Sequence, residues 1–323
     1  MHQVLSLKPE TYERHIIHSQ ERDWAETNCY VDIWIELLSS MGYEPIAALP
    51  YTLAIDFEGD QWTFFKFPLT DLFEIFQLDV QELALWLPLL EHIENQLKLG
   101  RPVLVELDSF YLPDTAGTAY GLNHVKSTVA ITEIDIKNHH MGYFHGQGYY
   151  HLDGDDFINI FKAYRKTNTE TLPPYAEIVK KVSNNKFSDK ETLDISKKLL
   201  KRQLKLIPEH NPFHKFKDKF IEDFNWLKTK DMEAFHQYSF ATLRQFGACY
   251  ELAYNYLNWL ISNGEPGLTE ISMKIKKISE QAKIYQFQLA RSISRGKPLD
   301  TTPLDEMAEN WQIATTSLKN LYA

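Results

Sequence analysis

The chain has 323 residues, of which 44% are hydrophobic, 13% aromatic and 24% charged. This composition is typical of a globular protein with a large core, and it excludes a disordered or fibrous chain. The formal net charge of -10 argues against general binding to nucleic acid or to an anionic membrane surface. A chain of this length is expected to form two domains.

Cys29 and Cys249 are the two cysteines, too few and too far apart for a disulfide framework or a zinc site of paired cysteines. The segment from Met1 to Glu10 lacks the basic flank and apolar core of a signal peptide. The sequence shows no apolar stretch that approaches the length of a membrane span. These features predict a cytoplasmic protein and leave its oligomeric state open.

The first half of the chain mixes helical and strand patterns. Helical periodicity marks residues 29–41, 71–77, 81–99 and 153–164. Compact apolar or alternating runs of strand character mark residues 102–107, 124–135 and 141–145. A polar turn at 136–140 joins the last two as an antiparallel hairpin. The pattern predicts an α+β domain over residues 1–170, with helices packed on an antiparallel sheet.

The second half is helical throughout. Residues 166–190, which include Pro173 and Pro174, have the composition of an interdomain connector. Apolar residues at helical spacing then predict a bundle of about five helices, near 189–206, 212–228, 231–262, 268–294 and 303–321. We expect this all-α domain to span residues 171–323. Arg244, Gln245 and Glu251 lie near its apolar stripe, and a buried polar network or an interdomain contact explains them better than catalysis does.

Cys29 lies where a thiol can become a nucleophile. It follows Asn28 and opens an apolar helical run that stops at Gly42. The positive end of the helix dipole favours thiolate over thiol, so Cys29 is a candidate catalytic residue. The alternative is a small buried hydrophobic side chain, which is the interpretation that suits Cys249 in its apolar helix.

A catalytic thiol needs a nearby base, and His124 is the best candidate because it begins a predicted strand after the loop from Asp114 to Asn123. The alternative is a loop histidine without a special role. The residue that orients this base is undecided among His145, Asp135, Asp108 and Asp114. Asp135 closes the same strand roughly 35 Å away, which side chains cannot bridge.

Three carboxylates, those of Asp56, Glu58 and Asp60, lie within five residues of one another. They lack the spacing of a calcium-binding loop, so a solvated turn or a rim that faces substrate is favoured over a metal site. The histidine pairs His139–His140 and His15/His18 likewise lack companions at the spacing of a metal site. The sequence therefore predicts neither a metal nor a bound cofactor.

Several distinctive motifs occur in both halves of the chain, at residues 28–32, 56–66, 112–118, 124–126, 142–145 and 240–245. Together they resemble those of a bacterial domain-of-unknown-function family, number 1839. The resemblance brings no established reaction. It implies a setting in specialised-metabolite biosynthesis, because members of this family often lie near genes for nonribosomal peptides.

A more distant resemblance links the order of Cys29, residues 100–113 and His124 to the N-terminal domain of butirosin-type acyltransferases. It implies a papain-like fold followed by a helical region, and transfer of an aminoacyl group from an acyl carrier protein to an amine. Cys29 would accept the acyl group and His124 would deprotonate first the thiol and then the amine. His145 stands on the return strand, where relatives place a third catalytic residue.

The chain departs from papain-like peptidases at Asp23, where many of them carry an oxyanion-stabilising glutamine. Oxyanion stabilisation would then fall to the Cys29 backbone N–H and the Asn28 side chain.

We therefore expect a cysteine acyltransferase that forms an acyl-Cys29 intermediate from a carrier-protein phosphopantetheine thioester and passes the acyl group to a small-molecule acceptor. The catalytic candidates are Cys29, His124 and His145, and the substrate-binding candidates are Asn28, Asp56, Glu58, Asp60 and Asp114. A papain-like peptidase or amidase and a non-catalytic binding module of the same fold are the alternatives. Docking of an acidic carrier protein would require a basic patch, for which Lys197, Lys198, Lys201 and Arg202 are candidates.

Overall fold

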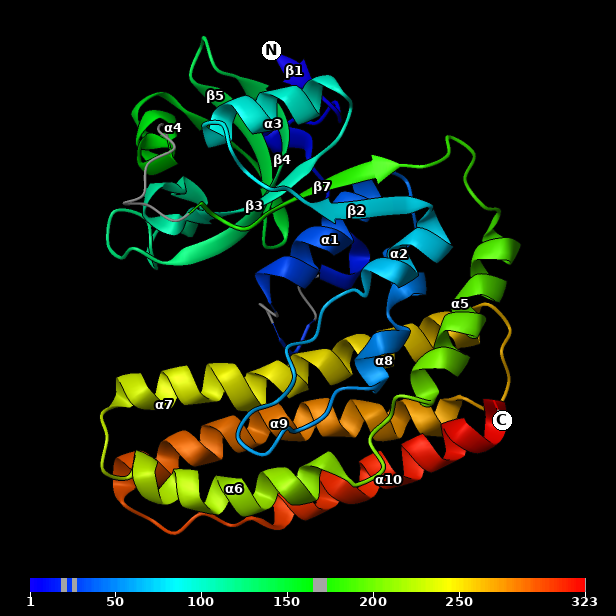
Figure 1. The fold of residues 1–323 in the computed structure, drawn as a ribbon. Coiled ribbons are helices and arrows are strands. Elements are labelled where there is room, and N and C mark those ends of the chain that lie inside the picture. Colours follow the sequence, from blue (N-terminus) through cyan, green and yellow to red (C-terminus); the bar gives the residue numbers. More distant parts are fainter. Residues whose placement is uncertain (19–21, 25–27, 165–172, 323) are drawn as a thin grey trace. The chain divides into compact units, whose positions relative to one another are not determined.

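The computed structural model describes residues 1–18, 22–24, 28–164 and 173–322 (Figure 1). The chain divides into two compact units, each assembled from separate stretches. The first unit comprises residues 1–19, 28–45 and 69–186, and the second comprises residues 20–27, 46–68 and 187–323. This division differs from the predicted boundary at residue 170, because the chain passes between the units several times.

An antiparallel sheet forms the centre of the first unit. Over the described residues it contains seven strands, namely β1 (His2–Gln3), β2 (Leu78–Glu82), β3 (Val103–Asp108), β4 (Lys126–Asp135), β5 (His140–His145), β6 (Gly148–Asp153) and β7 (Ala176–Lys181). Their order is β2-β7-β3-β4-β5-β6, and β1 pairs with β4. The predicted hairpin is confirmed as β4 and β5, with Asp135 opposite His140. The expected α+β region with an antiparallel sheet is thus present.

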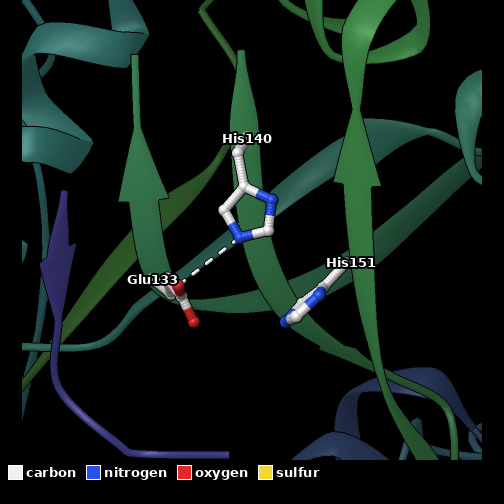
Figure 2. A group of neighbouring side chains, drawn as sticks. All are labelled: Glu133, His140 and His151. Atoms are coloured by element: carbon white, nitrogen blue, oxygen red, sulfur yellow. Dashed lines mark ion pairs between the residues drawn. The ribbon is translucent and has the colours of Figure 1, made fainter. Parts of the chain in front are cut away.

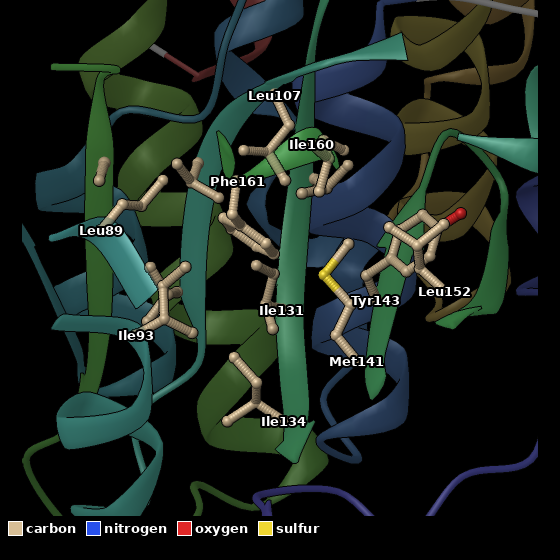
Figure 3. Close-up of a cluster of buried hydrophobic side chains, with 14 of the residues drawn as sticks. Leu89, Ile93, Leu107, Ile131, Ile134, Met141, Tyr143, Leu152, Ile160 and Phe161 are labelled. Carbon is tan, nitrogen blue, oxygen red and sulfur yellow. The ribbon is translucent and has the colours of Figure 1, made fainter. Parts of the chain in front are cut away.

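Helices α3 (Leu89–Lys98) and α4 (Gly154–Ile160) pack on one face of this sheet. Side chains from alternate strand positions, among them Val105, Ile131 and Tyr143, form a buried apolar cluster with them (Figure 3). The opposite face carries Phe144 and Tyr149, against which the ring of Tyr12 packs with centroid distances of 5.7 and 6.0 Å. The alternation of strand side chains therefore separates two cores, one on each face.

Helix α1 (Cys29–Ser40) belongs to the second of these faces. It begins at residue 29 because the Asn28 side chain caps it, accepting a hydrogen bond from the Val31 N–H at 2.8 Å. It ends before Gly42, whose φ of 75° suits glycine. The remaining helix of the first unit is α2 (Leu69–Phe76), which agrees with the predicted helix at 71–77.

Two predicted segments of the first unit differ from the structure, and strands β1 and β6 were not predicted. The predicted helix at 81–99 is wrong in its first part, because Gln81 and Glu82 pair with β7 and the helix begins only after Pro88. The predicted connector contains β7, whose Ala176, Ile178 and Val179 are buried. Residues 166–172 of that connector lie outside the described residues. In both cases strand pairing prevails over a weak local pattern.

The second unit contains the predicted helical region. Its helices are α5 (Asp189–Leu204), α6 (Pro212–Leu227), α7 (Met232–Ser239), α8 (Gln245–Ser262), α9 (Thr269–Arg295) and α10 (Thr302–Tyr322). Ser188 and Glu191 form a capping box at the start of α5, and Asn211 caps α6. In the described parts of the chain, no helix is both long and apolar enough to cross a membrane.

The longest predicted helix, at 231–262, is interrupted by a π-helical turn at Phe240–Arg244. Beyond that turn, Glu251 is nearly buried and accepts hydrogen bonds from the Arg22 guanidinium at 3.1 and 3.2 Å. It also accepts one from the Asp23 N–H at 2.8 Å. This network is the structural role that we predicted for Glu251, and it leaves the carboxylate paired with a cation.

A buried histidine fastens the N-terminal segment of the first unit to α1. The imidazole of His18 is fully buried and bonds through Nε2 to Asp32 at 3.1 Å and through Nδ1 to Glu36. Tyr12 also donates to Glu36, and the His15 N–H lies 3.1 Å from that carboxylate. Burial alone lowers the pKa of His18, but the hydrogen bonds that the ring donates to the two carboxylates outweigh it and hold the pKa above the usual value.

We predict that this group makes stability depend on pH. A raised pKa in the folded state means that His18 stabilises fully below about pH 6.5, and that this contribution is lost as pH rises through the raised pKa. His18→Gln should destabilise by about 3 kcal/mol at pH 6 and flatten the pH dependence. Urea unfolding measured across the pH range tests this. His139→Asn, an exposed control, should unfold like the wild type, and an unchanged pH profile in His18→Gln would refute the assignment.

Candidate functional site

The two thiols have opposite environments, and each is described within its own unit. Cys29 is the first residue of α1 and is partly exposed. The next residue, Tyr30, donates a hydrogen bond to Glu177 of β7 at 2.8 Å, which fixes the first turn of the helix over the sheet. Cys249 is fully buried in α8 and donates to the Thr52 carbonyl at 3.4 Å. Burial raises the pKa of Cys249 well above its usual range, which makes this thiol unreactive.

His124 is held by an aspartate, and the sequence had left Asp108 open as one of four candidates for that role. The Nδ1 atom of His124 lies 2.6 Å from Oδ2 of Asp108, and the ring stacks on Phe110 at 4.3 Å. With the Nδ1 proton donated to Asp108, the Nε2 atom is left as an acceptor. The side chain is 66% exposed and precedes β4 instead of beginning it. An oriented base is thus present where β3 ends and just before β4 begins.

The structure does not bring Cys29 and His124 into contact. Among the described residues, no hydrogen bond joins the two side chains. Glu177, the anchor of the α1 first turn, pairs with Leu104, and Asp108 lies four residues further along β3. Four residues at the rise of a strand place the backbone of Asp108 about 13 Å from that of Leu104. The thiol and the base belong to the same unit, but they would have to approach each other to react.

His145 belongs to a different group of side chains. Its Nδ1 lies 2.5 Å from Oδ2 of Asp114, and its Nε2 lies 2.7 Å from Oγ of Ser127. Tyr143 donates to the other oxygen of Asp114 at 2.5 Å. The carboxylate is nearly buried, and the group lies on the sheet face that bears Tyr143, away from α1. Both nitrogens of His145 therefore have partners other than His124.

The other predicted site residues are divided between the two units. Asn28 uses its side-chain oxygen to cap α1. Asp56 forms an ion pair with Lys215 at 2.8 Å within the second unit, whereas Glu58 and Asp60 are exposed in the turn at Gly59. Asp60 lines a surface hollow together with Lys219 and Asp223. Their assignment to substrate binding stays a prediction, as does that of Asp114.

One group of possible metal ligands was missed by the sequence analysis. Glu133, His140 and His151 come from three successive strands, and their side chains turn toward one another (Figure 2). One ligand atom from each lies within 4.8 Å of the others. The pairing of Glu133 with Gly142, and of Gly142 with His151, creates this group. Only the strand register reveals it, because the residues are not at the spacing of a known metal motif.

Two family models match the chain. One, described as the DUF1839 N-terminal domain, covers residues 13–181, and the other, described as the DUF1839 C-terminal domain, covers residues 189–320. No curated protein matches the chain. The comparisons thus give no support for similarity to butirosin-type acyltransferases. With both models matched in order along its length, the chain belongs to the DUF1839 family.

Proposed function

We propose that the protein is a papain-like cysteine acyltransferase in which Cys29 is the nucleophile and His124 the base. The observation that carries the proposal is the hydrogen bond of 2.6 Å between His124 and Asp108. It supplies an imidazole of defined tautomer, held by a carboxylate, as thiol chemistry requires. Cys29 adds a partly exposed thiol at the start of a capped helix, where unpaired N–H groups and the helix dipole favour negative charge.

The reaction would proceed in two balanced steps. In the first, His124 takes the proton of Cys29, the sulfur attacks the thioester carbonyl, and the donor thiol leaves with that proton as an acyl-Cys29 thioester forms. In the second, an acceptor amine attacks the acyl-enzyme, its proton passes through His124 to the departing Cys29 sulfur, and an amide is released. Thioester exchange suits this site because it needs little help to the leaving group.

This chemistry sets a geometric requirement. The sulfur of Cys29 and Nε2 of His124 must come within about 3 to 3.5 Å of each other in the complex with substrate. Catalytic hydrogen bonds are often long before substrate binds and shorten in the complex. His124 lies outside β4 and its side chain is 66% exposed, so burial does not oppose such an approach, which would have to move the Asp108–His124 pair and the start of α1 toward each other.

The proposed donor is an acyl or peptidyl carrier protein, and the proposed acceptor is a small amine. The predicted docking patch on α5 is partly neutralised, because Lys197 pairs with Glu265 at 2.7 Å. We propose Lys198 and Lys201 as the cations of that patch that dock the carrier, together with Arg202, which also has a partner within the protein.

A second candidate function, a serine hydrolase, is favoured by the Asp114–His145–Ser127 chain of hydrogen bonds. Its geometry matches the order of acid, base and nucleophile in serine enzymes. Ser127, however, lies in a paired strand opposite Leu107 and not at a helix N-terminus, where unpaired N–H donors gather to stabilise an oxyanion. We therefore rank this candidate below the thiol enzyme.

The partly exposed Cys29 and the buried Cys249 should differ in thiol reactivity. Near pH 7, iodoacetamide should label Cys29 at least about 100-fold faster than the buried Cys249, which serves as an internal control. His124→Ala should leave the rate for Cys29 within about twofold of the wild type in the free protein, because the two side chains are apart until substrate binds, and the loss of the base should appear instead as slower acyl transfer to Cys29. Peptide mass spectrometry of timed samples measures both rates. His145→Ala should likewise leave the rate for Cys29 unchanged, and labelling of Cys29 as slow as that of Cys249 would contradict its role as the nucleophile.

The proposed reaction requires a covalent acyl adduct on Cys29. Intact mass measurement after incubation with a short-chain acyl-pantetheine thioester should show one acyl adduct in the wild type and in Cys249→Ala, and none in Cys29→Ala. Asp108→Asn should slow adduct formation by about tenfold or more, since His124 loses its orienting carboxylate. An unaltered rate in Asp108→Asn would argue against the dyad. A fluorophosphonate adduct on Ser127 without any adduct on Cys29 would instead select the serine hydrolase.

A further inference from the structure

Three strands place an acid and two imidazoles in one row on the sheet. Glu133 of β4 pairs with Gly142 of β5, and Gly142 pairs in turn with His151 of β6. Because Gly142 has no side chain, the hydroxyl of Tyr149 lies over it, and Glu133 and His151 stand at the same level on the two neighbouring strands. His140 stands two residues before Gly142 on the same face, and its ring lies 4.7 Å from that of His151.

The surroundings of His140 prepare one of its nitrogens for a ligand. Its Nδ1 lies 2.6 Å from Oδ1 of Asp153, so the proton of the neutral ring is held there. Its Nε2 points at Oε1 of Glu133, 3.4 Å away (Figure 2). A carboxylate that accepts the other ring N–H of a ligating histidine, and so fixes its tautomer and orientation, is a common arrangement around metal ions.

Glu133 is a buried acid whose second oxygen is already bound. The residue is 5% exposed, and its Oε2 accepts a hydrogen bond from Gln3 at 3.0 Å and one from Tyr149 at 3.4 Å. These contacts leave Oε1 directed toward the histidines.

His151 supplies an independent observation. Its Nε2 is buried and, among the described residues, has no hydrogen-bond partner. A buried polar atom without a partner is costly, and native structures contain few of them. An ion held between His151, His140 and Glu133 would satisfy this atom.

The distances fit such an ion. For ligand bonds of about 2.1 Å in tetrahedral geometry, neighbouring ligand atoms are separated by roughly 3.4 Å. The separation between His140 and Glu133 equals this value, and all three ligand atoms lie within 4.8 Å of one another. Small rotations of the His151 side chain would close the remaining distance.

We propose that Glu133, His140 and His151 bind a divalent transition-metal ion of the zinc type through one carboxylate oxygen and two imidazole nitrogens. Imidazole ligands favour such ions over magnesium and calcium, which prefer oxygen. Three protein ligands leave a fourth position to water or to another small ligand. The site uses none of the residues of the proposed thiol chemistry, so either assignment can fail without the other.

Metal binding by the full chain tests the site. After treatment with a chelator and its removal, the wild type should bind one equivalent of Zn²⁺ in calorimetry at pH 7.5 and show visible absorption of a bound Co²⁺ ion. His151→Gln and Glu133→Gln should each weaken Zn²⁺ binding by about 100-fold or more. His139→Asn, the matched control at an exposed neighbouring histidine, should bind like the wild type, because asparagine tolerates the positive φ of 53° at that position.

Circular dichroism of each variant without metal separates loss of a ligand from loss of the fold. Folded variants that bind Zn²⁺ as tightly as the wild type would overturn the proposal. So would a wild type that shows no Zn²⁺ binding and no rise in Tm when Zn²⁺ is added, and the group would then be an ion pair between His140 and the two carboxylates beside it. Reduced binding in His151→Gln with full binding in His139→Asn supports the site.

Asp153 allows a separate test of how the orientation of His140 affects metal binding, because it would contact His140 and not the metal. Asp153→Asn should weaken Zn²⁺ binding by about tenfold while one equivalent still binds. Calorimetry measures the change against the wild type. An effect as large as that of His151→Gln would mean that Asp153 is itself a ligand, and no effect would show that the orientation of His140 does not matter for binding.

Discussion

The burial of two carboxylates on α1 is the constraint on which the first unit depends. Asp32 and Glu36 are almost fully covered, and a buried charge without a partner is far more costly than a buried polar pair. His18 forms hydrogen bonds with both carboxylates, and Tyr12 donates a further one to Glu36. The N-terminal segment is thereby held against α1, and the ring of Tyr12 packs on the sheet in turn. The direction of α1, and with it the place of Cys29, follows from these contacts.

The helical half could be predicted from the sequence because its signals are local. Ser188, Asn211 and Pro212 mark helix starts, and apolar residues recur at helical spacing along each segment. The π-helical turn at Phe240–Arg244 left no such signal, since the apolar pattern continues through it. Strands β2 and β7 were missed because their residues become a sheet only by pairing with each other, a contact between positions about a hundred residues apart.

The candidate site could be predicted only in part. The position of Cys29 at a helix start follows from Asn28 and the apolar run, whereas the choice of Asp108 over Asp114 as the partner of His124 depends on how the loop between β3 and β4 folds back. The group at Glu133 was beyond sequence analysis for a physical reason. Simple alternation places Glu133 on the face of Ile131, but an irregularity between them turns the carboxylate to the face of His140.

Each unit is assembled from three separate stretches of the chain, which limits how the two units can be produced separately. Each unit draws on stretches on both sides of residue 45, so one cut in the gene cannot release either of them whole. A clone that stops at residue 170 would also lack β7, the partner of both β2 and β3, and would expose the edges of two strands. Dissection of this protein therefore calls for circular permutation or a spliced linker in place of truncation.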